Sequence, residues 1–209
     1  MKKLGMIFAI LVGSLGAQAG WLIEPMVGYS TGTQLSYKYG ATPTTYTYSE
    51  GSVPMGGSLG YEFSDGFFVG LDGIYNYAGT LTSQISSITN SENFTRGAIG
   101  AKVAFRVGKV SVFAGYNPLV NTYMISTTSN PLWLLNGTGA FGGFTFKAAN
   151  HFDIIARYDY YSYSNYETGT TKATSTAISG SAAAGAISGT PTDSSVSVMI
   201  GIPFGSSGK

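Results

Sequence analysis

The sequence contains no cysteine, a single histidine and few charged residues. The absence of cysteine excludes disulfide scaffolds, thiol catalysis and cysteine-ligated metal sites. Charged residues make up 10% of the chain, against about 25% in a typical globular domain. The 11 basic and 10 acidic residues nearly balance, so we expect no basic surface for nucleic acid. A surface so poor in charge dissolves badly in water, which favours a location in a lipid bilayer.

The first 19 residues have the pattern of a secretory signal peptide. Residues 2 and 3 are lysines, residues 4–15 are apolar, and residues 17–19 form an A-x-A cleavage site. The apolar stretch is about a dozen residues long, which is too short for a membrane-spanning helix. We therefore expect residues 1–19 to be removed on export.

No later segment has the roughly 18 consecutive apolar residues that a transmembrane helix needs. Only helices and closed barrels can cross a bilayer, because hydrocarbon cannot satisfy open backbone groups. A membrane location would therefore require a β-barrel. We expect residues 20–204 to form it as a single domain, and residues 205–209 to form a short periplasmic tail.

Alternation of apolar and polar residues predicts eight strands, joined by connections that alternate in length. The strands are predicted over residues 21–30, 53–63, 67–77, 94–106, 110–117, 132–147, 152–161 and 195–204. Short turns are predicted at 64–66, 107–109 and 148–150, and long polar loops at 31–52, 78–93, 118–131 and 162–194. Outer-membrane barrels have short periplasmic turns and long external loops. The pattern therefore predicts an all-β, eight-stranded, antiparallel, up-and-down transmembrane β-barrel with both termini in the periplasm.

The alternation alone leaves open which face of each strand points inward, because a soluble barrel or sandwich gives the same period. The polar face carries many glycines, which suit a crowded interior: Gly28, Gly56, Gly60, Gly70, Gly100, Gly115 and Gly201. Its charges are few and balanced, and we expect them to form an interior polar network: Glu24, Glu62, Asp72, Arg96, Lys102, Arg106, Asp153, Arg157 and Asp159. Both features favour a lumen lined by the polar face.

Aromatic residues on the apolar face collect at the strand ends. One predicted girdle, at the periplasmic rim, comprises Trp21, Tyr61, Phe63, Phe67, Phe105, Phe144, Phe146, Phe152 and Phe204. The other, at the outer rim, comprises Tyr29, Tyr75, Tyr77, Tyr116, Tyr158 and Tyr160. Two aromatic girdles around an aliphatic band are what the two interfaces of a bilayer select. The apolar face is therefore predicted to contact lipid.

In strand number, alternation of loop length and a last strand ending at Phe204, the sequence resembles the small eight-stranded outer-membrane barrels of the OmpA and OmpX type. The resemblance covers the whole chain after residue 19. It implies contact with outer-membrane lipid and lipopolysaccharide, and insertion by the barrel-assembly machinery, which reads a terminal Phe in that family. Residues 205–209 follow Phe204, which departs from the family pattern. We expect a monomer.

Two possible chemical sites have simpler explanations in a barrel wall. Residues 137–142 match the GxGxxG pattern, but a strand follows them, whereas a dinucleotide site requires a helix. His151, the only histidine, follows a predicted periplasmic turn, away from any outer-leaflet substrate, and one imidazole makes a poor metal site. We therefore expect no catalytic residue, no metal and no cofactor.

Three functions remain open at this point. The first is a non-enzymatic envelope protein whose external loops, rich in Tyr, Thr and Ser, make surface contacts. The second is a narrow channel for ions or small solutes through the charged lumen. The third is a lipid-modifying enzyme, which the position of His151 disfavours.

Overall fold

The structure is a computed structural model, and it describes residues 19–39, 44–83, 91–125, 132–149, 151–168, 176–177 and 187–205. The predicted signal peptide, apart from residue 19, and tail residues 206–209 lie outside the described residues. Within the described part of the chain, no helix is long and apolar enough to cross a membrane.

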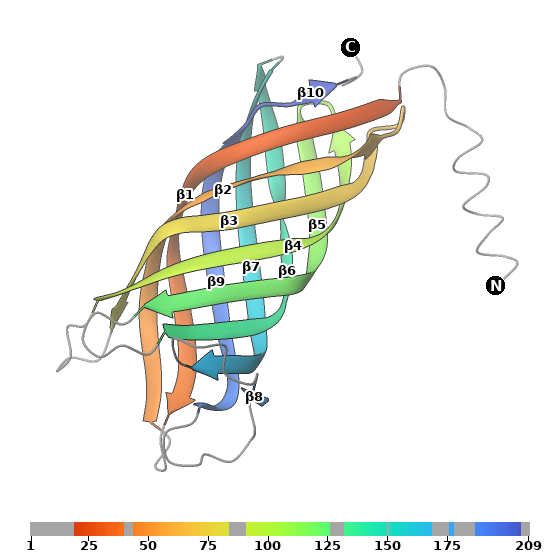
Figure 1. The fold of residues 1–209 in the computed structure, drawn as a ribbon. Helices are drawn as coiled ribbons and strands as arrows, with labels where there is room; N and C mark the ends of the chain where they lie inside the picture. Colours follow the sequence, from red (N-terminus) through yellow and green to blue (C-terminus); the bar gives the residue numbers. More distant parts are fainter. Residues whose placement is uncertain are drawn as a thin grey trace, which may run out of the picture.

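Eight long antiparallel strands close into a barrel (Figure 1). They are β1 (Gly20–Tyr39), β2 (Thr44–Glu62), β3 (Phe67–Ser83), β4 (Ser91–Val107), β5 (Val110–Ile125), β6 (Leu132–Ala149), β7 (Phe152–Thr168) and β9 (Ile187–Gly201). Strands β1 to β7 pair in sequence order, and β9 pairs with both β7 and β1, which closes the ring. The predicted fold class is confirmed.

Two short strands complete the sheet. β8 (Thr176–Ala177) pairs with β7, and β10 (Phe204–Gly205) pairs with β1. The predicted last strand, 195–204, is therefore divided, because Ile202 and Pro203 separate β9 from β10 and Pro203 has no backbone N–H to donate. β10 lies at the end of the barrel that carries the tight turns, and β8 lies at the opposite end (Figure 1).

Tight turns join β2 to β3 and β4 to β5. In the first, the Phe67 N–H donates to the Asp65 carboxylate (3.1 Å) and Gly66 adopts a φ of 84°. The second is a two-residue loop between the paired residues Val107 and Val110, with Gly108 at a φ of 61°. Glycine tolerates a positive φ, and such two-residue loops match the twist of a hairpin. The predicted short connections at 64–66 and 107–109 are therefore confirmed.

The predicted long loops are wrong over much of their length. Instead of the 9–11 residues needed to cross a bilayer, the strands have 15 to 20 residues. They continue through residues 31–39, 44–52, 78–83, 91–93, 118–125, 162–168 and 187–194, which were predicted as loops. These segments are rich in Tyr and Thr, which have a high propensity for strands whichever face of the sheet they occupy. Without an apolar face they lack the alternation on which the sequence prediction depended.

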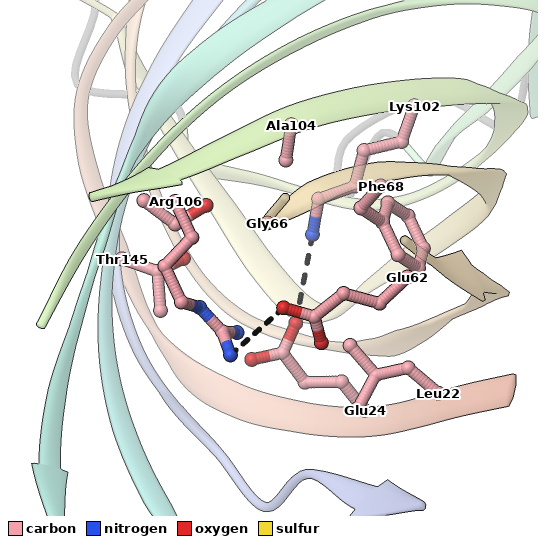
Figure 2. Close-up of a pocket in the computed structure, with 10 residues that line it drawn as sticks. Leu22, Glu24, Glu62, Gly66, Phe68, Lys102, Ala104, Arg106 and Thr145 are labelled. Carbon is pink, nitrogen blue, oxygen red and sulfur yellow. Dashed lines mark ion pairs between the residues drawn. The ribbon is translucent and has the colours of Figure 1, made fainter. Parts of the chain in front are cut away.

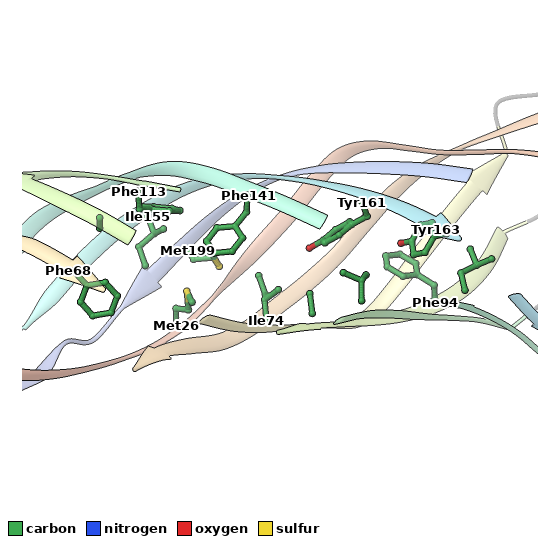
Figure 3. Packing of buried hydrophobic residues seen from close by; sticks show 14 of the residues in the cluster. Met26, Phe68, Ile74, Phe94, Phe113, Phe141, Ile155, Tyr161, Tyr163 and Met199 are labelled. Atoms are coloured by element: carbon green, nitrogen blue, oxygen red, sulfur yellow. The ribbon is translucent and has the colours of Figure 1, made fainter. Parts of the chain in front are cut away.

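The two faces of the wall differ as the alternation predicts. Outward side chains such as Leu71, Leu119 and Val198 are about three-fifths exposed, at 60%, 64% and 58%. Inward side chains are buried, and they include charged residues together with a row of large apolar and aromatic groups along the lumen (Figure 3). The lumen is therefore filled by side chains, as expected for a barrel of eight strands.

Candidate functional site in the barrel lumen

All nine predicted network residues point into the lumen. Eight of them are buried, and the Arg106 side chain is 20% exposed near the end of β4. Buried ions are expensive unless each is paired and hydrogen-bonded. The pairs form three groups along the barrel axis.

The first group lies at the end of the barrel that carries the tight turns (Figure 2). Arg106 Nη1 lies 3.0 Å from Glu62 Oε1, and Lys102 Nζ lies 3.5 Å from Glu24 Oε2. The Asp153 carboxyl lies beside Glu24. The cavity between these groups has a volume of about 20 Å³, which is space for roughly one water molecule. This end of the lumen is therefore too tightly filled to hold a solute.

The second group is centred on Arg157. Its Nη1 lies 2.6 Å from Asp72 Oδ1, and its Nε lies 2.9 Å from both carboxylate oxygens of Asp159. The Ser58 hydroxyl donates to Asp72 Oδ2 at 3.0 Å and accepts from Lys102 Nζ at 2.9 Å. Because Ser58 joins Lys102 to Asp72, the first and second groups form one continuous chain of polar contacts.

The third group lies toward the opposite end of the barrel and includes two residues that the sequence prediction missed. Arg96 forms an ion pair with Asp193 of β9, and both side chains are 1% exposed. The Tyr163 hydroxyl lies 2.8 Å from Thr122 Oγ1 and donates to Asp193 Oδ2 at 3.4 Å. Asp193 and Tyr163 were both placed in the predicted loop 162–194. Asp193 lies two residues before the inward Ser195 and four before the inward Ser197, so it shares their face of β9. This period of two could have identified it.

Aromatic rings lie against each of the three most buried cations. The sequence prediction missed these ring contacts. The Arg157 guanidinium carbon is 4.0 Å from the Phe141 ring centre, and Arg96 is 4.6 Å from that of Tyr161. Lys102 Nζ is 4.7 Å from the Phe113 ring centre. Cations are attracted to ring faces, and more strongly when water is excluded. The lumen therefore stabilises its cations with rings as well as carboxylates.

Inward glycines make room for these rings. A Cβ at Gly60 or Gly70 would lie 2.6 Å or 2.7 Å from Cζ of Phe68, and one at Gly115 would collide with the Phe141 ring. Each ring thus occupies the space that a side chain at a nearby inward position, on its own or the neighbouring strand, would need. At Gly28, Gly56 and Gly100 an added Cβ would instead collide first with a backbone carbonyl oxygen of the neighbouring strand. Close rings and close backbone together explain why the polar face carries so many glycines.

The predicted girdle residues lie on the outward face. At the end with the tight turns, four of their rings are in successive contact: Trp21 with Tyr61 at 5.9 Å, Tyr61 with Phe63 at 5.1 Å, and Phe63 with Phe67 at 5.9 Å between ring centres. The tyrosines of the other predicted girdle are exposed, at 44% for Tyr75 and 54% for Tyr116.

The two motifs set aside in the sequence analysis have the expected surroundings. Residues 137–142 lie within β6, in the middle of a strand. His151 is exposed directly before β7, whose first residues pair with the end of β9. Among the described residues, no group of three or more His, Asp and Glu side chains could hold a metal ion.

Comparison with known proteins identifies the fold. No protein-family model and no curated protein sequence matches the chain. The outer membrane protein OprG from Pseudomonas aeruginosa is similar in structure, with a TM-score of 0.53 and 13% identity, over 90% of this chain and 98% of that one. This chain has the fold of the small eight-stranded outer-membrane β-barrels. At this level of identity the likeness shows the fold alone.

Two further structures of this class also match. Neisserial surface protein A has a TM-score of 0.48 and 11% identity, over 90% of this chain and 100% of that one. Ail, the attachment invasion locus protein of Yersinia pestis, has a TM-score of 0.48 and 14% identity, over 88% of this chain and 98% of that one.

Proposed function

We propose that the protein is a non-enzymatic outer-membrane protein whose closed barrel anchors strand extensions that make contacts at the cell surface. The filled lumen is the observation that carries this proposal. Three groups of ion pairs and their stacked rings occupy the barrel along its axis. A lumen filled in this way supports a rigid anchor better than a solute pathway.

The length of the strands supports a role outside the bilayer. β1 continues from Tyr29, in the predicted outer girdle, to Tyr39, which corresponds to about 33 Å along the strand. β1 and β2 stay paired to that point, with Tyr39 opposite Thr44. The barrel wall would thus project well beyond the membrane surface as a paired sheet, which is a stiff support for recognition.

The location and partners follow from the same proposal. The exposed aliphatic band between two aromatic girdles fits outer-membrane lipid and lipopolysaccharide. Residues 1–19 would direct export, both termini would lie in the periplasm, and the barrel-assembly machinery would insert the chain as a monomer. Heat-modifiable gel mobility combined with membrane fractionation tests this part, and a protein that stays folded in water without detergent would contradict it.

Surface contact is tested by shortening the barrel extension without disturbing its register. Thr33 pairs with Glu50, so replacing residues 34–49 by Asn-Gly shortens β1 and β2 equally and closes them with a two-residue turn. We expect bacteria that display this variant to lose adhesion to epithelial monolayers and to polystyrene. The matched control shortens β5 and β6 at the paired residues Met124 and Trp133. Undiminished adhesion by the β1–β2 variant would refute surface contact through this extension.

Ion passage is the second candidate, and the continuous chain of polar contacts favours it. Glu24, Lys102, Ser58, Asp72 and Arg157 follow one another along the lumen at contact distances between 2.6 and 3.5 Å. Planar-bilayer recording separates the two functions, because a permanently filled lumen gives no steady single-channel steps. Steady steps that Lys102→Met alters would establish conduction and overturn the role of a simple anchor.

A further inference from the structure

A groove runs across the outward face of the wall from β1 to β5. It consists of two adjoining hollows, of about 360 Å³ and 400 Å³, that share Gly56, Gly73 and Ile99. Gly57 lies in one hollow, and Gly97 and Asn121 lie in the other. We call these six residues the outer groove.

The groove exists because outward positions carry no side chain. Gly57 pairs with Gly73 on the neighbouring strand, and Gly97 pairs with Tyr75. Gly73 and Gly97 alternate with the inward residues Asp72, Ile74, Arg96 and Ala98, so their missing side chains would face outward.

The barrel does not itself require glycine at the two central positions. A Cβ at Gly73 would meet its nearest atom, Ala98 O, at 4.0 Å, and a Cβ at Gly97 would meet Tyr75 Cδ2 at 3.8 Å. Neither residue has a positive φ. Glycine weakens a strand by roughly 0.5–1 kcal/mol relative to alanine, so the open space needs an explanation outside the chain.

The position of the groove indicates what fills it. Leu71, Ile99 and Leu119 around the groove are 60%, 58% and 64% exposed. The groove is therefore continuous with the band that faces hydrocarbon. The hollow that contains Gly97 and Asn121 is also lined by Tyr75 of the predicted outer girdle, so under the proposed topology this end of the groove reaches the outer leaflet. An acyl chain of the outer leaflet fits this position.

Asn121 supplies a polar contact at one side of the groove. It is exposed on the outward face of β5 and pairs with Gly97. On β5, Asn121 follows Tyr116 of the predicted outer girdle by five residues, so under the proposed topology it would lie at the outer interface, where the acyl chains join their head groups. The acyl chains of outer-leaflet lipopolysaccharide are attached through esters and amides, whose carbonyl oxygens accept hydrogen bonds from such an amide.

We propose that the outer groove binds one acyl chain of a lipopolysaccharide molecule, with Asn121 donating to the carbonyl of its ester or amide link. The inference rests on the outer-membrane location proposed above, but it does not depend on adhesion or on conduction. The bound lipopolysaccharide would stay on this face of the barrel and would not exchange freely with the surrounding lipids.

Lipid retention measured by native mass spectrometry tests the proposal. The full chain is folded into nanodiscs containing lipid A and phosphatidylethanolamine and then released into mild detergent. We expect wild-type protein to retain one lipid A, and Gly73→Leu and Gly97→Leu to retain it at least tenfold less often, because leucine fills the groove. Ala140→Leu, at an exposed outward position on β6, is the matched control and should behave as wild type.

The remaining outcomes are also decisive. Equal retention by wild type and both glycine variants, or retention of phosphatidylethanolamine as often as lipid A, would overturn the proposal. Heat-modifiable gel mobility verifies folding, and if a leucine variant fails to fold, Gly73→Ala and Asn121→Leu carry the same comparison. Failure of the outer-membrane location would appear separately, as absence of the expressed protein from the outer-membrane fraction.

Discussion

On the inner face of the barrel wall glycines lie beneath aromatic rings, whereas on the outer face Gly73 and Gly97 border open space. An added Cβ at Gly60 or Gly70 would come within 2.7 Å of the Phe68 ring, but one at Gly73 would meet nothing closer than 4.0 Å. The same residue type therefore has two roles in the same strands. Inside, glycine accommodates a neighbouring side chain; outside, it leaves a hollow for something else.

The two faces also differ in how much a substitution is expected to lower the stability of the barrel. An inward position belongs to a packed set of ions, rings and hydrogen bonds, so removing one member leaves others without partners. In the proposed membrane location, an outward position meets a fluid solvent of hydrocarbon, which adapts to the shape of any apolar side chain. We therefore expect inward changes to be costly in general, and outward changes to be costly only when they bring a charge.

The largest effect is expected from removing the central lumen cation. Arg157→Met leaves Asp72 and Asp159 buried and unpaired, which should lower the free energy of unfolding by about 3–5 kcal/mol. Urea titration of the protein folded in lipid vesicles measures this change. The control is Lys109→Met at the exposed β4–β5 turn, which should change stability by at most about 0.5 kcal/mol. Similar effects of the two changes would remove the distinction between the faces.

The next effect tests the outward face directly. Leu71→Arg places a charge in the apolar band, where Leu71 is 60% exposed, and should lower the free energy of unfolding by about 2–4 kcal/mol if it lies near the midplane. Leu71→Met keeps the volume and should change it by less than about 1.5 kcal/mol. The same titration compares them, and a harmless arginine would contradict the assignment of lipid to this face.

A pair of identical substitutions then compares the two kinds of glycine. Gly115→Ala would push a methyl group into the Phe141 ring and the Ala101 backbone, and we expect a loss of about 1–3 kcal/mol from overpacking. Gly73→Ala should stabilise the empty barrel by about 0.4–1 kcal/mol, because it restricts the unfolded chain without a clash. Thermal and urea unfolding in lipid-A-free detergent measure both. Equal losses at the two positions would mean that the outer groove is part of the packing.

The smallest effect concerns one hydroxyl group in the lumen. Tyr163→Phe removes the contacts with Thr122 and Asp193 and should lower the free energy of unfolding by about 0.5–1.5 kcal/mol. Tyr160→Phe, on the outward face of the same strand, should change it by at most about 0.5 kcal/mol. A larger effect at Tyr160 would show that the outward hydroxyls are also structurally coupled.

Alternation of residue type was enough to predict the barrel, its eight strands and the nine charged residues of its lumen. It worked because lipid and lumen impose opposite chemistry on neighbouring residues of each strand, as for Leu71 and Asp72. It failed in the strand extensions beyond the predicted outer girdle, where residues such as Thr33 and Tyr37 pair in a strand although no apolar face distinguishes them. There, pairing with the neighbouring strand determines the structure, and a single sequence does not contain that information in its periodicity.

Pairing within the lumen could not be predicted for a related reason. Arg157 reaches Asp72 across the barrel, and Arg96 reaches Asp193. Which strands face one another depends on the stagger between strands, which is set around the whole ring. Phe68, Phe113 and Phe141 fall on the polar face of their strands in the sequence. The alternation of residue type gave no reason to expect that their rings would stack on the lumen cations.

The seam where β1 meets β9 joins segments from opposite ends of the sequence. All other pairings of long strands join neighbours in the chain, so closing this seam costs the most chain entropy. A polypeptide that ends before residue 187 would leave β1 and β7 with unpaired edges, which recruit other chains. Frameshift and nonsense changes that remove β9 should therefore yield aggregating products, not smaller barrels.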